Sequence, residues 1–147
     1  MTAIKRELFR IIDANFNRSR EGLRVCEDIS RFILNSPRIS GELKSVRHGI
    51  SAIIKASPAT SKMLLEARDS AGDVGRASRT PSEMKRLGYC DIYSANMQRA
   101  KESVRVLEEF FKLIDKKHAS ALSRIRFRIY DIEKKTVNRL TSLRNTR

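Results

Sequence analysis

The chain has 147 residues, of which 40% are hydrophobic and 33% charged, and 31 lysines and arginines against 17 acidic residues give a net charge of +14. This size predicts one domain, 1–147, with a core of its own. The sequence has no membrane-length apolar run, no signal-peptide pattern and too few cysteines for a disulfide scaffold, so we expect a cytoplasmic protein with reduced thiols. The positive charge predicts an anionic partner, which can be a nucleic acid, a phosphorylated metabolite or an acidic membrane surface.

The low content of glycine and proline and the helical spacing of apolar residues predict an all-α bundle of about five to six helices. One stretch, ARDSAGDVGRASRTPSE, is rich in glycine and predicts an ordered loop. At its end, TPSEMKRLG has the cap and proline of a helix start. In chain order, the main helices are expected over about 3–34, 40–56, 61–68, 92–116 and 119–143.

The sequence contains an internal repeat. ANFNRSREGLRVCED, which begins at Ala14, returns 81 residues later as ANMQRAKESVRVLEE. When the segment from Ala14 to Ile33 is aligned with the second copy, eight positions are identical. The repeat predicts two halves related by a pseudo-twofold axis, in which the long helices of about 3–34 and 92–116 are equivalent.

A weaker match extends the repeat to a second pair of helices. LKSVRHGISAI can be laid on LSRIRFRIYDI, which pairs Arg47 with Arg126 and Ile50 with Ile129. Chance similarity between helices is the alternative explanation. Arg47 is a further candidate for a substrate contact, as a basic clamp beside the main site.

The repeated polar residues fall on the apolar side of their helices. On a helical wheel, Asn15 and Arg18 lie in the middle of an apolar face, with Gly22 beside them. Asn96 and Arg99 lie likewise in the second copy. Because a buried guanidinium costs several kcal/mol unless its charge is matched, the pattern predicts a cavity for an anion. Structural ion pairs with internal carboxylates are the alternative.

The other repeated charges fall on the opposite, polar side of the wheel. Their spacing is typical of solvated ion pairs along a helix, or of a subunit interface. They are Glu21, Arg24 and Glu27, with Glu102, Arg105 and Glu108 in the second copy.

The glycine-rich loop concentrates groups that bind phosphate and metal ions. RDSAGDVGR supplies Arg68, Asp69, Asp73, Gly75 and Arg76. Arginines fork onto phosphate oxygens, and glycines allow close approach of backbone N–H groups. Asp69 and Asp73 are candidates for holding Mg²⁺, which prefers a few carboxylates together with phosphate oxygens. The alternative is a simple turn.

Four ordered motifs resemble a known family. They are RIIDANFNRSREGLRVCEDISRF, LKSVRHGI, LLEARDSAGDVGR and SANMQRAKESVRVLEEFFK. They are similar to the monofunctional hydroxymethylpyrimidine phosphate kinases of bacterial thiamin biosynthesis, all-helical domains often fused before thiamin phosphate synthase. The resemblance covers nearly the whole chain. Because no synthase domain follows in this sequence, we expect a stand-alone or shortened form, with a non-catalytic relative of the same fold as the alternative.

The resemblance implies transfer of the γ-phosphoryl group of ATP, with Mg²⁺, onto 4-amino-5-hydroxymethyl-2-methylpyrimidine phosphate. The wheel and the motifs together give Arg18, Arg99, Arg68 and Asp69 catalytic roles. Substrate binding is assigned to Asn15, Asn96, Arg47, Gly75 and Arg76. A functional link to thiamin phosphate synthase and a homodimer are also expected.

Three rival functions stay open at this point. A nucleic-acid-binding protein would use the basic C-terminal helix, although Arg residues turned into an apolar face cannot reach a duplex. A different helical enzyme on an anionic metabolite, such as a chorismate-mutase-like bundle, would need no Mg²⁺ and no acidic loop. A helical interaction module without activity would have no cavity.

Overall fold

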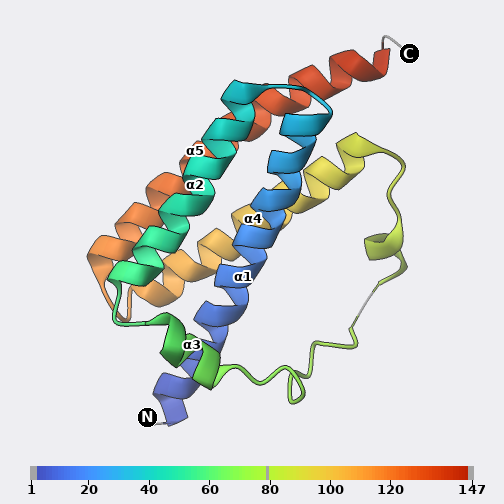
Figure 1. Ribbon diagram of the computed structural model, residues 1–147. Helices are drawn as coiled ribbons and strands as arrows, with labels where there is room; N and C mark the ends of the chain where they lie inside the picture. The colour runs from blue at the N-terminus through green and yellow to red at the C-terminus, as the bar shows by residue number, and fades with distance from the viewer. Residues whose placement is uncertain (1–2, 79, 146–147) are drawn as a thin grey trace.

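The protein is built of helices, as the computed structural model in Figure 1 shows for residues 3–78 and 80–145. These described residues contain no strand, and the prediction of an all-α bundle is confirmed. The elements are α1 (Ala3–Phe32), α2 (Pro37–Ala56), α3 (Ser61–Ala67), the 3₁₀ helix η1 (Pro81–Met84), α4 (Tyr89–Phe111) and α5 (Lys116–Asn145).

Helix α2 begins earlier than the expected position near residue 40. The hydroxyl of Ser36 accepts a hydrogen bond from the backbone N–H of Ile39 at 3.2 Å, and Pro37 occupies the first helical position. A serine cap satisfies one of the free N–H groups of a helix start, and proline there loses no hydrogen bond. The Ser-Pro pair that follows α1 is therefore a start signal for α2 as well as a stop signal for α1.

The expected helix at TPSEMKRLG is only the four-residue turn η1. The Thr80 side chain makes no capping bond, and every residue of η1 is exposed. A short helix is marginal in water without an apolar face to bury, so this segment stays mostly irregular. Helix α4 then begins at Tyr89, directly after Gly88.

The two repeats form the two halves of the bundle. Helix α1 crosses α4 at the centre, α2 packs on α1, α5 packs on α4, and α2 also contacts α5. The largest fully buried side chains lie between these helices: Tyr93, Phe111, Ile12, Leu23, Leu43, Ile50, Ile54, Met97, Leu107, Leu122, Ile129 and Val46. Because these residues recur at helical spacing, each of the four long helices has an apolar face that packs into one common core.

Gly22 sets the distance between the two central helices. A Cβ atom at this position would lie 2.8 Å from the backbone oxygen of Asn96. On the helical wheel, Gly22 lies beside Arg18 on the face where a cavity is expected, and a residue this small would leave space there. Instead, the backbone of α4 fills that space, so the small residue serves close helix packing.

The connection from α3 to α4 lies outside this bundle. It leaves α3 beside the N-terminal end of α1 and returns to the start of α4 near the C-terminal end of α1, as Figure 1 shows. No helix among the described residues is long and apolar enough to span a bilayer.

Candidate functional site

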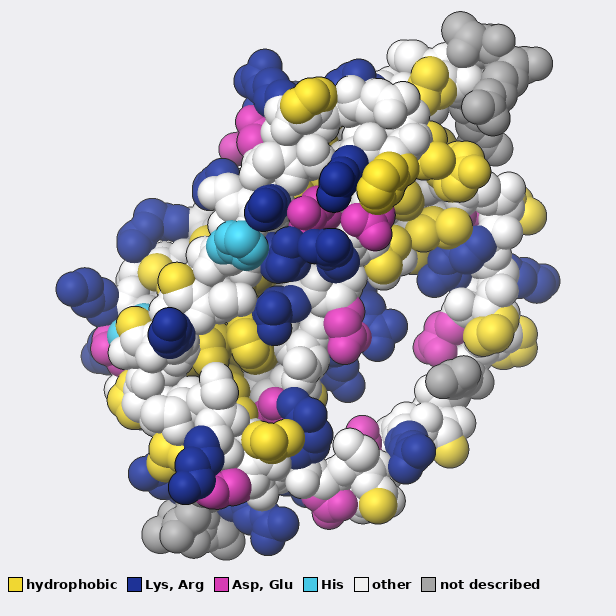
Figure 2. Space-filling view, in the orientation of Figure 1, with side chains coloured by type: hydrophobic (Ala, Val, Ile, Leu, Met, Phe, Trp, Pro, Cys, Tyr) yellow, Lys and Arg dark blue, Asp and Glu magenta, His cyan; other side chains and the backbone are white. Residues whose placement is uncertain are grey.

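The repeated arginines of the two central helices face one pocket. Arg18 of α1 and Arg99 of α4 both line an open pocket of about 790 Å³, together with Asp73, Gly75 and Arg76 of the α3–α4 connection. We call it the larger pocket. In Figure 2, the connection stands away from the helices around an opening, with Lys and Arg side chains at its rim. The structure thus brings both repeats and the loop together.

The prediction that Arg18 and Arg99 are buried is wrong. Both residues are exposed on the wall of this open pocket. The wheel placed them on the apolar face correctly, but in the described part of the chain no further α-helix packs over that face beside Arg18 and Arg99. The loop covers it instead, at a distance, and water reaches the guanidinium groups.

Three guanidinium groups of the larger pocket have no protein partner. Among residues 3–78 and 80–145, the side chains of Arg18, Arg76 and Arg99 take part in no hydrogen bond or ion pair. The structural alternative, in which internal carboxylates neutralise Arg18 and Arg99, is therefore excluded for the described part of the chain. Three free cations at one pocket form a site for an anion.

The two repeated asparagines are held by their own helices. The Asn15 side-chain N–H donates to the backbone oxygen of Ile11 at 2.9 Å, and that of Asn96 donates to Ile92 at 2.8 Å. Neither amide oxygen accepts a hydrogen bond from another described residue, so both can accept one from a ligand. Asn15 lines the larger pocket, whereas Asn96 is not among the residues that line it.

A second pocket adjoins the first. This smaller pocket, of about 490 Å³, is lined by α1 and by the start of the connection. Arg68 crosses its wall and donates two hydrogen bonds to the Asp13 carboxylate, at 2.7 Å and 2.8 Å. These bonds raise the pKa of Arg68 further above its usual range. Arg68 therefore fastens the loop to α1, a role different from the expected phosphate contact.

Asp13 is the residue that the sequence analysis missed. Its side chain is 8% exposed. The available signal was a lone carboxylate inside the apolar run FRIIDANF, because an acid at such a position needs a cationic partner.

The two loop carboxylates each organise a tight turn. Oδ1 of Asp69 accepts from the Gly72 N–H, and Oδ1 of Asp73 accepts from the Gly75 N–H, both at 2.9 Å. The Gly75 N–H, expected to meet phosphate, is therefore occupied. The second oxygen of each aspartate has no partner among the described residues.

These carboxylates fit a magnesium ion that takes its remaining ligands from phosphate and water. Asp69 and Asp73 both line the smaller pocket, and each offers one free oxygen. The described part of the chain contains no group of three or more metal-ligating side chains, so a dedicated protein cage is not present there. Mg²⁺ often needs only one or two carboxylates when it is bound with a substrate phosphate.

Arg47 lies away from both pockets. Its guanidinium donates to Glu27 at 3.0 Å and 3.4 Å. The equivalent Arg126 donates to Glu108 at 2.9 Å, which supports the second, weaker match of the repeat. A direct role of Arg47 in substrate binding stays an untested prediction, but its charge is already matched.

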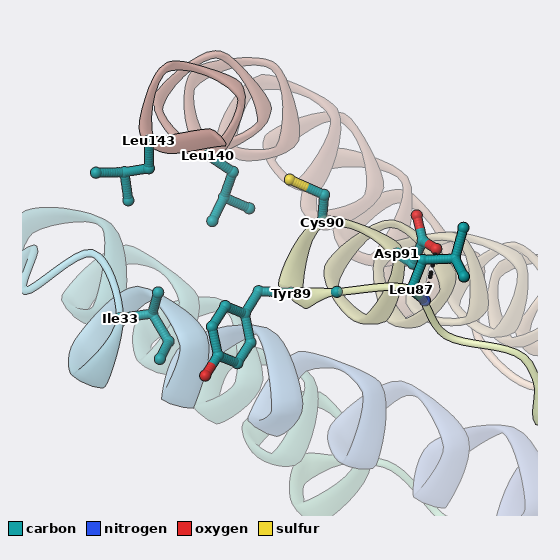
Figure 3. Close-up of a pocket in the computed structure, with 8 residues that line it drawn as sticks. Ile33, Leu87, Tyr89, Cys90, Asp91, Leu140 and Leu143 are labelled. Atoms are coloured by element: carbon teal, nitrogen blue, oxygen red, sulfur yellow. Dashed lines mark hydrogen bonds between the residues drawn. The ribbon is translucent and has the colours of Figure 1, made fainter. Parts of the chain in front are cut away.

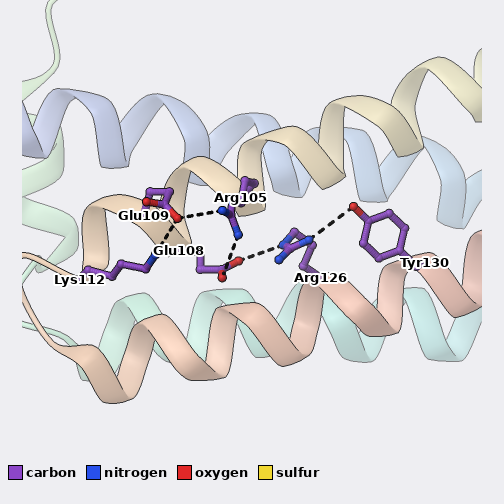
Figure 4. A network of polar contacts seen from close by, with 6 residues as sticks. All are labelled: Arg105, Glu108, Glu109, Lys112, Arg126 and Tyr130. Atoms are coloured by element: carbon purple, nitrogen blue, oxygen red, sulfur yellow. Dashed lines mark hydrogen bonds and ion pairs between the residues drawn. The ribbon is translucent and has the colours of Figure 1, made fainter.

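The interpretation of Glu27 and Glu108 as solvated residues is wrong. Both are only 7% exposed, because α2 and α5 pack over them and bring the partner arginines. Figure 4 shows the second of these networks, in which Glu108 bridges Arg105 and Arg126. Such pairs lock the register of α1 on α2 and of α4 on α5, since breaking one leaves a buried charge unpaired.

A third pocket is apolar and contains none of the predicted site residues. It measures about 310 Å³ and lies where the ends of α1 and α5 meet the start of α4. Figure 3 shows Ile33, Leu140 and Leu143 around it, with Tyr89 and the free thiol of Cys90. Its chemistry does not match the anion site of the other two pockets.

Comparisons with known proteins agree with the motifs. The ThiD2 family matches residues 10–135. Proteins named thiamine-phosphate synthase are 38% identical over 130 residues in Nostoc sp. and 36% identical over 128 residues in Rhodopirellula baltica. These matches cover 88% and 87% of this chain but 35% and 34% of the relatives, so the chain spans about a third of their length. No solved structure matches the chain.

Proposed function

Because the chain belongs to the ThiD2 family, we propose that it transfers the γ-phosphoryl group of ATP to hydroxymethylpyrimidine phosphate, giving the diphosphate. The relatives are named for the synthesis of thiamin phosphate, which supports a step of the same pathway. The single observation that carries the proposal is the set of free guanidinium groups, Arg18, Arg76 and Arg99, at one pocket. A reaction between two polyanions requires such groups.

The chemistry of the step suits these residues. An oxygen of the pyrimidine's phosphate attacks the γ-phosphorus, the bond from the γ-phosphorus to the bridging oxygen breaks, and ADP leaves with the electron pair. The attacking phosphate is largely deprotonated near neutral pH, so the step needs no strong general base. The barrier lies in bringing the reactants together in line and in stabilising charge on the transferred group.

The side chains then have distinct tasks. Arg18 and Arg99 bind phosphate oxygens from the two halves of the repeat, and Arg76 does so from the loop. The free oxygen of Asn15 orients the substrate by accepting from an amino group. Asp69 and Asp73 would hold Mg²⁺, which supplies charge neutralisation on the phosphates when it is bound.

The expected link to thiamin phosphate synthase is part of the same proposal. The relatives combine a segment similar to this chain with about twice as much further sequence under the synthase name. We infer that the diphosphate formed here is a substrate for a synthase, either in the same polypeptide or in a partner protein.

A direct test measures ADP release from ATP with Mg²⁺ and the pyrimidine monophosphate, and identifies the diphosphate by mass. We expect ADP and diphosphate in equal amounts. ADP release that does not depend on the pyrimidine, or no release at all by folded protein, would contradict the proposal. As a control for bulk charge, Arg24→Ala removes an exposed arginine that lines neither pocket.

A further inference from the structure

The two polar pockets share one wall. Asn15, Arg18 and Asp73 line both the larger pocket and the smaller one. Arg18 comes from α1 and Asp73 from the connection, so the boundary runs between the helices and the loop. Two adjoining spaces with a common wall are the arrangement that a reaction between two bound molecules needs.

The larger pocket is the more positive of the two, because four arginines face three carboxylates there (Asp73, Glu83 and Glu102), whereas three arginines face four carboxylates in the smaller pocket. It contains the unpartnered side chains of Arg18, Arg76 and Arg99. Its volume, about 790 Å³, also exceeds the 490 Å³ of the smaller pocket. A nucleotide triphosphate carries more charge and more volume than a pyrimidine monophosphate, so the larger pocket suits it better.

The smaller pocket offers much less free positive charge. Arg68 is committed to Asp13 by two short hydrogen bonds. Arg10 keeps most of its donors, because its contact with the backbone oxygen of Asp69 is long, at 3.5 Å. Together with Arg18, it can match a single phosphate group.

We propose that the nucleotide's phosphates occupy the larger pocket and the pyrimidine monophosphate the smaller one, with Arg18 in contact with both substrates. This assignment rests on the proposed kinase function and adds to it which pocket holds which substrate. The γ-phosphoryl group passes across the shared wall. The acceptor oxygen in the smaller pocket forms the new bond, and the ADP oxygen in the larger pocket takes the electrons of the broken one.

The test is isothermal titration of each substrate separately with four arginine variants. For Arg99→Ala, affinity for a non-hydrolysable ATP analogue should fall about tenfold or more, while affinity for the pyrimidine monophosphate changes less than about twofold. Arg10→Ala should show the opposite pattern, and Arg18→Ala should weaken both ligands. Arg24→Ala, the matched control, should change neither. These arginines are exposed or half-buried, so folding should persist, and circular dichroism checks this.

The outcomes separate this assignment from the kinase proposal. An exchange of the two patterns, or equal losses for both ligands in Arg99→Ala and Arg10→Ala, overturns the assignment even if ADP is released. The expected binding pattern without any ADP release supports the two pockets and refutes the transfer. Absence of binding of either ligand to the unaltered protein overturns both.

Discussion

The contact at Gly22 gives a sharp prediction for stability. In Gly22→Ala, the new Cβ would lie 2.8 Å from the backbone oxygen of Asn96, and neither helix backbone can yield locally. Overpacking of this kind costs about 1–3 kcal/mol. Alanine also gains about 1 kcal/mol of helix propensity over glycine. The net effect should be destabilisation of up to about 2 kcal/mol.

Gly41→Ala is the matched control. Gly41 also lies inside a helix, α2, but a Cβ there would meet nothing within 4 Å. Only the propensity gain applies, so this variant should be more stable than the unaltered protein by about 0.5–1 kcal/mol. The difference between the two variants, about 1–3 kcal/mol, measures the helix crossing alone.

Urea unfolding followed by far-ultraviolet circular dichroism measures both free energies of unfolding, provided that the slope with denaturant is unchanged. Stabilisation of equal size in both variants would refute the close crossing of α1 and α4. A second readout is pyrophosphate affinity. It should fall in Gly22→Ala but not in Gly41→Ala, because separating α1 from α4 also separates Arg18 from Arg99.

Four further predictions concern the site and the core. In Arg99→Ala, kcat/KM for the proposed reaction should fall at least about tenfold, and equal losses in Arg24→Ala would contradict the site. Asp13→Ala should expose the connection after α3 to limited proteolysis, because its ion pair fastens that segment, and an unchanged digestion pattern would exclude this anchoring role. Burial raises the pKa of Cys26, so a thiol reagent should label only Cys90 in the folded protein, and rapid labelling of both would refute the core position. Because the unfolded chain releases the Cys26 proton first, the free energy of unfolding should decrease by about 1.4 kcal/mol per pH unit between pH ~8.5 and pH ~10, and Cys26→Ala should remove this slope. Above pH ~10 the buried Tyr93, whose pKa is also raised by burial, adds a slope of its own.

Much of the fold could be predicted because its signals are local. Apolar spacing gave the long helices, and the polar repeat gave the equivalence of α1 and α4. The error at TPSEMKRLG has a physical cause, since cap and proline signals cannot make a stable helix without an apolar face to bury. The later start at residue 40 missed the local signal of Ser36 and Pro37, which was interpreted only as the end of α1.

The sequence predicted which arginines belong to the candidate site, but not which side chains bind one another. The wheel selected Arg18 and Arg99, and the loop supplied Arg76, all of which meet at one pocket. It did not reveal that Arg68 binds Asp13. Asp13 and Arg68 are far apart in the chain, and the loop that carries Arg68 can adopt several conformations. The sequence therefore does not show which arginine of the loop meets Asp13.

The sequence by itself determined the helices and the types of charged side chain, because each depends on residues close together in the chain. It also determined the duplication, because a repeat is found by comparing residue types alone. The tertiary structure decided which charges are free. Glu27 lies on the polar side of its helix but is buried by α2, whereas Arg18 lies on the apolar side but remains exposed. A helical wheel gives the direction of a side chain, and only the packing of the neighbouring elements decides whether protein or water lies in that direction.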